Sequence, residues 1–373
     1  MKRTSWFRLL IALSVMAFVA AACGGGDDDD ASTDEVTDEA SSSSTTIVPT
    51  VTLPEPDRAI EPLTGRDLGD EALLDTPAYA IKIDNDELAR PQNGLSRADI
   101  VFDLLIEANK TRFLAVFHSD VPDEIGPTRS ARSSDIDVLA ALGGPIFAYA
   151  GSNPGVAAEL QAAESGGVMT AINVDSVGPP TSFRDNERPR PHNLVSVPTE
   201  VIAAAGGEPG SPDPVLAYRA PDEVGDAGPG GGISLRIGAN SPAVYLWGGG
   251  LEGWGRYQNG SAHIDHDGTH IAPENLVVLE VEYGTSAADF DSPQARTVGT
   301  GTAVIARNGE IIESTWTRGA NTDPFQLTDA DGELILLDPG STWIELARPG
   351  DYTVLTPEEA VLQALALNTA AEG

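Results

Sequence analysis

Apolar residues gather in short dense runs in the first half of the chain, a pattern typical of buried strands. Residues 79–84 and 98–108 are two such runs, and residues 111–119 are a third that is rich in β-branched and aromatic side chains. Only the polar pair Asn109 and Lys110 separates the last two runs. A break this short predicts that they form a β-hairpin.

Two helices are predicted to follow these strands. The segment 130–144 starts with serines, carries Asp135 and Asp137 in its first turns and ends at glycines, which favours a helix. A short apolar run at 145–151 predicts another buried strand, and Pro154 then stands where the first turn of a second helix tolerates proline. Strands and helices in this order predict a mixed α/β domain over residues 60–206.

The second half of the chain has a strand-like pattern. Residues 207–232 are rich in Gly, Pro and Asp, which predicts a linker or a long surface loop. The pairs Asn308-Gly309 and, more weakly, Asn259-Gly260 stand between apolar runs and indicate hairpin turns. We expect a C-terminal β-rich domain over residues 233–356, followed by a terminal helix and tail over 357–373. The predicted fold class is α+β, with the mixed α/β domain preceding the β-rich one.

The N-terminus has the features of a lipoprotein signal peptide. Basic residues precede an apolar run that is too short to span a membrane, and three alanines stand immediately before Cys23. We interpret residues 1–22 as the signal peptide and Cys23 as the lipidated residue. The chain would then be extracytoplasmic, anchored to the outer face of the bacterial cytoplasmic membrane. The alternative is an ordinary signal peptide followed by an incidental cysteine.

Composition narrows the function classes. Cys23 is the only cysteine, so an intramolecular disulfide and a cysteine-based zinc site are excluded. Residues 23–59 consist largely of Asp, Ser, Thr, Gly and Pro, and they predict a disordered acidic tether. The formal net charge of −35, with no basic run, makes nucleic acid a poor partner. The acidity itself is explained by solubility.

Several motifs together resemble one known family. The segments LTGRDLG (from residue 63), RPQNGLSRAD (from 90), GPTRSAR (from 126) and PRPHNL (from 189) closely resemble those of the YerB-like lipoproteins. The resemblance covers residues 62–352 and implies two consecutive domains of unknown function in an extracytoplasmic lipoprotein. It lends no residue a catalytic role. The motif positions in this sequence are Asp84, Asn85, Arg90, Pro91, Gln92, Asp99, Glu107, Arg112, Arg129, Ser130, Arg132, His192 and Asn193.

Arginines concentrate in the first domain in spite of the acidic composition. Arg129 and Arg132 are three residues apart, so on the predicted helix they would share a face. Planar guanidiniums beside a serine-containing helix start suit phosphate or carboxylate recognition. The candidate ligand-binding residues are Arg90, Arg112, Arg129, Ser130, Arg132, Asn85, His192 and Asn193.

Two alternatives stand beside this anion site. The arginines could instead pair with carboxylates in a structural ion network, or they could never meet in space. The carboxylates available for such a network are Asp84, Asp99, Asp103, Glu107 and Asp135.

A divalent cation is a further hypothesis. Asp84 and Asp99 follow or precede apolar strands and could supply the oxygen ligands that such ions prefer, although Asp and Asn at strand ends also form turns. His263, His266 and His270 form a second candidate metal set, for which a polar turn is the alternative.

Three functions remain open. The first is a membrane-tethered lipoprotein that binds an anionic cell-envelope polymer or its precursor. The second is a metal-dependent enzyme acting on a phosphorylated envelope polymer or precursor. The third is a protein-interaction scaffold in the envelope with a protein partner. The sequence contains no P-loop, G-x-S-x-G or H-E-x-x-H motif, and catalytic residues are unknown.

Overall fold

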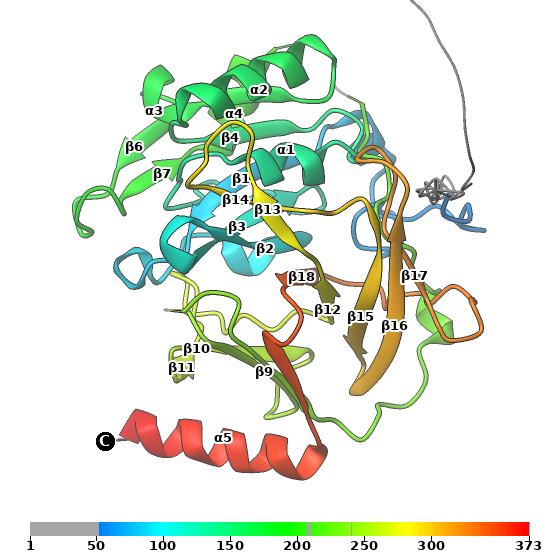
Figure 1. Ribbon diagram of the computed structural model, residues 1–373. Coiled ribbons are helices and arrows are strands. Elements are labelled where there is room, and N and C mark those ends of the chain that lie inside the picture. The colour runs from blue at the N-terminus through cyan, green and yellow to red at the C-terminus, as the bar shows by residue number, and fades with distance from the viewer. Residues whose placement is uncertain (1–51, 207–209, 240, 373) are drawn as a thin grey trace, which may run out of the picture. The chain divides into compact units, whose positions relative to one another are not determined.

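A ten-stranded sheet forms the centre of the molecule (Figure 1). The computed structural model describes residues 52–206, 210–239 and 241–372. The predicted signal peptide, Cys23 and the tether up to residue 51 lie outside the described residues. Within the described part of the chain, no helix has the length and apolar character needed to cross a membrane.

Both halves of the sequence contribute to this sheet, in the order β17-β16-β15-β12-β18-β2-β3-β1-β4-β5. The halves join where β18 pairs in parallel with β2, with Thr342 opposite Ile100 and Glu345 opposite Asp103. The strands of the first half are β1 (Tyr79–Asp84), β2 (Ile100–Ile106), β3 (Lys110–Phe117), β4 (Ile146–Tyr149) and β5 (Thr170–Asn173). Those of the second half are β12 (Asn275–Glu280), β15 (Gly299–Arg307), β16 (Glu310–Arg318), β17 (Gln326–Thr328) and β18 (Thr342–Ala347).

A second, five-stranded sheet has the order β11-β10-β9-β8-β19, and two short ribbons complete the strands. The sheet consists of β8 (Gly232–Leu235), β9 (Ala243–Trp247), β10 (Trp254–Gln258), β11 (Ser261–Ala262) and β19 (Tyr352–Leu355). The ribbons are β6 (Ser182–Arg184) with β7 (Leu194–Ser196), and β13 (Tyr283–Thr285) with β14 (Pro293–Ala295).

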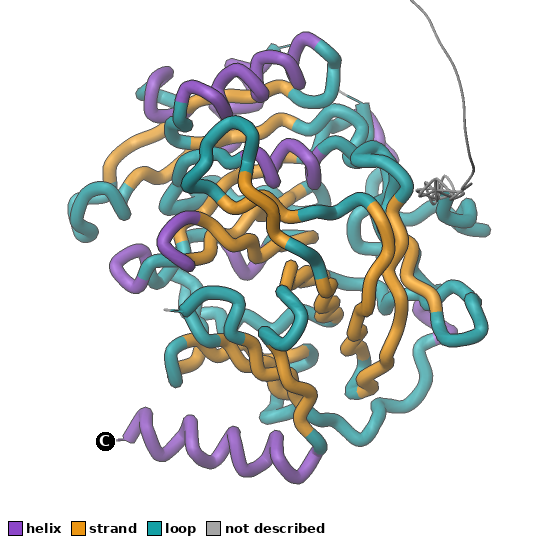
Figure 2. Tube along the Cα trace, in the orientation of Figure 1, coloured by secondary structure: helices purple, strands orange, loops and turns teal. Residues whose placement is uncertain are grey.

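The helices lie outside the strands, and in Figure 2 the strands occupy the space between the upper helices and the C-terminal helix. The α-helices are α1 (Ser133–Leu139), α2 (Pro154–Ser165), α3 (Val174–Val177), α4 (Pro198–Ala205) and α5 (Pro357–Glu372). Five 3₁₀ turns are η1 (Glu71–Asp75), η2 (Glu87–Ala89), η3 (Leu95–Arg97), η4 (Glu107–Asn109) and η5 (Pro221–Glu223).

The central strands of the ten-stranded sheet are buried on both faces, as in β1, β2 and β18. Alternate residues of β3 enter different cores: Leu114 and Val116 pack with α1 and α2, whereas Phe113 and Ala115 pack with the five-stranded sheet. The dense apolar runs of the sequence are therefore strands covered on both sides. The α+β class, with a mixed first half and a strand-rich second half, is confirmed.

Local turn signals were reliable. The predicted hairpin is β2–β3, whose turn places Ala108 and Asn109 at positive φ, and Asn308-Gly309 connects β15 and β16 as expected. The second helix begins at Pro154, with Asn153 as its N-cap. The segments expected as two domains share one sheet, and Val215 and Leu216 in the region between them are buried in its core.

One buried arginine connects the two sheets. Arg256 of β10 is fully buried, and its Nη2 lies 3.6 Å from Asp103 Oδ2 on β2. Its Nε donates to Tyr245 Oη at 2.8 Å, and that hydroxyl donates to Glu345 Oε1 on β18 at 2.5 Å. The guanidinium also lies over the Trp343 ring, 4.9 Å from its centroid. Burial raises the pKa of Asp103 and Glu345, and the positive charge of Arg256 acts in the opposite direction by stabilising their ionised forms.

Replacing Arg256 is expected to destabilise the fold strongly. Arg256→Met leaves Asp103 and Glu345 buried without a counter-ion, which costs about 3–5 kcal/mol of unfolding free energy. Arg348→Met is the matched control, because Arg348 pairs with Asp351 at the surface and its loss costs about 0–1 kcal/mol. Denaturant unfolding measures both values. Equal unfolding midpoints for the two variants would contradict this assignment.

Candidate functional site

The candidate site lies where β1 and β3 end beside the segment that leads to α1. Asp84, the last residue of β1, is opposite Arg112 of β3. The segment that leads to α1 pairs with the end of β1. Thr128 forms a bridge with Ile83, and the Arg129 amide donates to the Lys82 carbonyl at 2.8 Å. Arg112 and Arg129 are therefore brought to the same end of the sheet as Asp84.

His192 reaches this point from the loop between β6 and β7. Its Nδ1 lies 2.7 Å from Asp84 Oδ2. Arg129 Nε lies 3.3 Å from the same oxygen, and Arg129 Nη1 donates to the Pro191 carbonyl at 3.2 Å. One carboxylate thus orients both the imidazole and the guanidinium.

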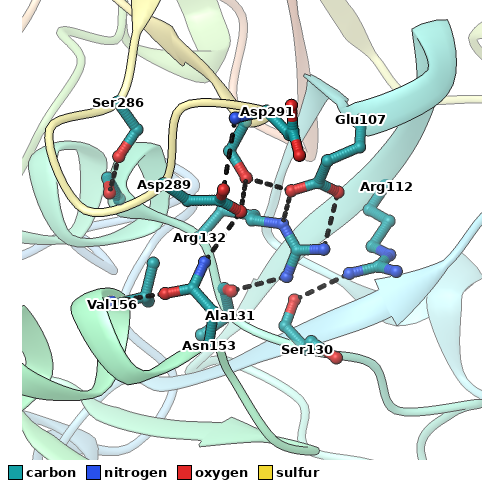
Figure 3. A network of polar contacts seen from close by, with 12 residues as sticks. Glu107, Arg112, Ser130, Ala131, Arg132, Asn153, Val156, Ser286, Asp289 and Asp291 are labelled. Atoms are coloured by element: carbon teal, nitrogen blue, oxygen red, sulfur yellow. Dashed lines mark hydrogen bonds and ion pairs between the residues drawn. The ribbon is translucent and has the colours of Figure 1, made fainter.

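Arg112 differs from its neighbours because no carboxylate of the described residues forms an ion pair with it, although the negative charges of Asp84 and Glu107 act on it. Its side chain is almost completely buried, and Nη1 donates to the Ser130 carbonyl at 3.0 Å (Figure 3). Its buried Nε has no hydrogen-bond partner in the described part of the chain. Burial, reinforced by the positive charges of Arg132 and Arg129, lowers the pKa of Arg112 to about 10.

Arg132, in contrast, is held by an internal ion pair. Its Nε and Nη2 donate to the two oxygens of Glu107 at 2.5 and 2.6 Å. Ser292 also donates to Glu107, and the network continues through Asp289 to Asn153 at the start of α2 (Figure 3). The structural alternative therefore describes Arg132, whereas Arg112 forms no ion pair among the described residues and donates only to the Ser130 carbonyl.

The premise that Arg129 and Arg132 share a helix face is wrong. Helix α1 starts only at Ser133, and Arg132 is its N-cap with φ −136° and ψ 159°. The Asp135 side chain accepts from the Arg132 amide at 2.7 Å, which fixes the helix start at this position. The residues before it are extended because they pair with the end of β1.

A polar cavity of about 430 Å³ opens at this site. We call it the arginine cavity; its basic lining is Lys110, Arg112, Arg129 and His192. Asp84, Asp86 and Glu87 form its acidic lining, and Lys110 Nζ pairs with Asp86 at 2.8 Å. Ser241 and Asn259 of the second half also line it. The cavity thus combines positive donors from several elements with one acidic wall.

The other predicted ligand residues are placed differently. Asn85 is in the cavity wall, but its side-chain amide already has partners within the protein. It donates to Thr111 Oγ1 and accepts from Gln258, both at 2.8 Å. Asn193 shapes the β6–β7 loop by donating to the Asp185 carbonyl at 2.9 Å. Ser130 contributes its carbonyl to Arg112. Arg90 is not among the lining residues and borders a separate cavity.

Lys110 was missed as a site residue because it was interpreted only as part of the hairpin break. It is the first residue of β3, and side chains two positions apart on a strand point to the same face. The spacing of Lys110 and Arg112 would therefore have placed both at one site.

The proposed metal ligands do not meet. Asp84 lies at the Arg112 end of the β1–β3 pair, whereas Asp99 lies at the opposite end, where it accepts the amides of His118 and Ser119 at 2.5 and 2.9 Å. In the parts of the chain that are described, no three His, Cys, Asp or Glu side chains are grouped so as to hold a metal ion.

The three histidines of the second half also diverge. Arg256 donates to His263 Nδ1 at 2.6 Å, so Nε2 carries the proton and bonds Gln92 Oε1 at 2.9 Å. Both ring nitrogens of His263 are thereby occupied. His270 Nε2 bonds the Arg256 carbonyl at 2.8 Å. The segment is a structural turn at the edge of the second sheet.

Comparisons with known proteins identify the family. Residues 63–210 match the model described as "Protein of unknown function (DUF3048) N-terminal domain", and residues 233–344 match that of the DUF3048 C-terminal domain. The chain belongs to the YerB-like family. It is 27% identical over 319 residues to "Putative lipoprotein YerB" of Bacillus subtilis, covering 80% of this chain and 89% of that protein.

The family fold is also seen in a solved structure. The crystal structure of the YerB protein from Bacillus subtilis superposes with a TM-score of 0.69 at 24% sequence identity. The match covers 80% of this chain and 99% of that one. The fold of this chain is therefore similar to that of the YerB protein over 80% of its length.

Replacing Arg132 is expected to lower the unfolding free energy of the protein. Arg132→Gln breaks a largely buried bidentate pair and leaves Glu107 without its partner, which lowers the unfolding free energy by about 1–3 kcal/mol. Arg97→Gln removes the exposed Arg97–Asp120 pair and serves as control, with a loss of about 0–1 kcal/mol. Thermal or denaturant unfolding tests the difference; a larger loss in the Arg97 variant would refute it.

The same pair predicts a pH dependence. Burial alone would raise the pKa of Glu107, but hydrogen bonds from Arg132 and Ser292 outweigh it and hold the pKa at about 2. Because the folded-state pKa is depressed, this contribution to stability is present above pH 4.5 and is lost as the pH falls towards 2. The stability difference between wild type and Glu107→Gln should shrink over that window when unfolding is measured at each pH. A constant difference would contradict the ion pair.

Proposed function

We propose that the chain is a lipoprotein, anchored through Cys23 to the outer face of the cytoplasmic membrane, that binds an anionic cell-envelope ligand in the arginine cavity. The anchoring is supported by the alanines before Cys23 and by the name of the Bacillus subtilis relative. The ligand class is supported by one observation above all: a buried Arg112 that borders a cavity without a counter-ion.

The energetics of burial favour an anion beside Arg112. Burying a charge without an ion pair is costly, and like charges at Arg129 and Arg132 add to that cost, whereas the negative charges of Asp84 and Glu107 offset only part of it. A phosphate or carboxylate in the cavity would supply the missing charge and accept from the guanidinium in a bidentate manner. The guanidinium of Arg129, which Asp84 already orients, would donate further hydrogen bonds to the same anion.

The acidic wall makes the site selective. Asp86 neutralises Lys110, and Asp84 is shared by His192 and Arg129. The cavity therefore attracts an anion on its Arg112 side and repels one on its Asp86 and Glu87 side. A ligand whose negative groups are spaced apart, so that none lies against Asp86 and Glu87, has the chemistry that fits both sides.

A second candidate is an enzyme acting on a phosphorylated envelope polymer or precursor. The contact between His192 and Asp84 favours it, because a carboxylate on Nδ1 orients an imidazole for acid–base chemistry through Nε2. This enzyme hypothesis does not include the divalent cation that the sequence predicted at Asp84 and Asp99. Hydrolysis of bis(p-nitrophenyl) phosphate by the wild type, lost in His192→Asn, would favour catalysis over binding.

Arg112→Met tests the proposed binding. In the full chain in detergent, inorganic phosphate or pyrophosphate should raise the melting temperature of the wild type in a salt-sensitive manner, and Arg112→Met should abolish the rise. Without ligand the variant should be at least as stable as the wild type, because it loses a buried unpaired charge.

The control is Arg97→Gln, an exposed arginine at the other end of β3 that should leave the phosphate response intact. A response that survives in Arg112→Met would refute the site. A wild type that responds to no anion would shift the function towards a protein-interaction scaffold.

A further inference from the structure

A second cavity adjoins the arginine cavity. Its volume is about 310 Å³, and Arg90, Pro91, Gln258, Ser261, His263 and Ile264 contribute to its lining. It lies against the β10–β11 hairpin. Asn259, in the turn of this hairpin, lines the arginine cavity. We call it the Arg90 cavity.

Arg90 resembles Arg112 in having no counter-ion. Its Nε is buried without a hydrogen-bond partner, and no carboxylate of the described residues pairs with its guanidinium. Burial lowers the pKa of Arg90, and the positive charge of the buried Arg256 acts in the same direction. Arg90 is only partly buried, so its guanidinium, which has no ion pair among the described residues, is open to an external anion in this cavity.

The two cavities share a wall. Gln258 of the Arg90 cavity donates to Asn85 Oδ1 of the arginine cavity at 2.8 Å. The negative charges that act on Arg90 are those of Glu87, Asp86 and Asp84, which all line the arginine cavity. A ligand that extends past this wall would reach both unpaired arginines.

We propose that the ligand is a linear polyanion with negative groups at repeated spacing, one held by Arg112 and Arg129 and another by Arg90. This rests on the proposed function, because it assigns the ligand class of the same site. A single phosphate can neutralise only one of the two arginines, whereas a chain of phosphates neutralises both. Linking the two groups makes the second contact intramolecular, which raises the overall affinity by about 100-fold or more when the spacing fits.

Arg90→Gln separates the two subsites. With the full chain in detergent, isothermal titration with inorganic phosphate and with a short linear polyphosphate gives the two affinities. We expect the variant to bind phosphate at the arginine cavity as the wild type does and to lose about tenfold or more of its polyphosphate affinity. Arg307→Gln is the matched control, since Arg307 also has a buried Nε without a partner but lines neither cavity.

Ser261→Glu is a second variant that retains Arg90. Ser261 is exposed and lines the Arg90 cavity, so a carboxylate there should weaken polyphosphate binding without disturbing the fold. It keeps the test decisive if Arg90→Gln fails to fold.

The outcomes distinguish this inference from the proposed function. If phosphate binds and both variants retain full polyphosphate affinity, the second subsite is refuted and the arginine cavity stands. Equal losses for phosphate and polyphosphate would also refute it, because Arg90 would then act through the first cavity or the fold. If neither probe binds to the wild type, the proposed function itself fails.

Discussion

The buried charge of Arg256 is the constraint on which the rest of the structure depends. Asp103 and Glu345 are opposite each other on β2 and β18, the two strands that join the halves of the chain, and both are buried. Burial raises the pKa of both carboxyl groups, and the positive charge of Arg256 between the sheets acts in the opposite direction by stabilising their ionised forms. The same guanidinium donates to Gln258, Gln258 donates to Asn85, and Asn85 donates to Thr111, the neighbour of Arg112. A continuous polar chain thus connects the joint between the halves with the wall between the two cavities.

Arginine has two distinct uses in this fold. Arg132 donates to both oxygens of Glu107, and Arg256 donates to Tyr245 and Gln258 while its charge lies beside Asp103, so that each fixes the relative position of several elements. Arg112 and Arg90 form no ion pair among the described residues, although the chain contains 57 acidic residues and only 22 basic ones. In so acidic a protein a counter-ion would be easy to provide, so its absence at two cavity-lining positions is informative. Buried groups left unsatisfied at a cavity are commonly the ones that a ligand completes.

The sequence predicted what depends on neighbouring residues. Asn308-Gly309, the break at Asn109 and the start of α2 at Pro154 are local signals, and the structure follows them. The parallel pairing of β2 with β18 has no local signal, because it joins residues such as Ile100 and Thr342. Arg112, Arg129 and His192 were candidate ligand residues from their types, but the sequence left open whether they meet in space. It also could not show which arginine is paired, because Glu107 reaches Arg132 through a tertiary contact and α1 begins three residues later than the serine-rich pattern indicated.

The acidity of the chain bears on how such a site would operate. A formal net charge of −35 repels a polyanion approaching from any side, but at physiological ionic strength the repulsion is screened beyond about 8 Å. A buried guanidinium is screened far less, so its attraction dominates once the ligand is at the cavity. Added salt weakens the repulsion from the protein surface and the attraction to exposed cations. It weakens the attraction to a buried guanidinium less, which favours binding at the cavity over nonspecific binding. Under this proposal, an acidic body with unpaired arginines at two adjoining cavities would exclude polyanions from most of its surface and bind them at these cavities.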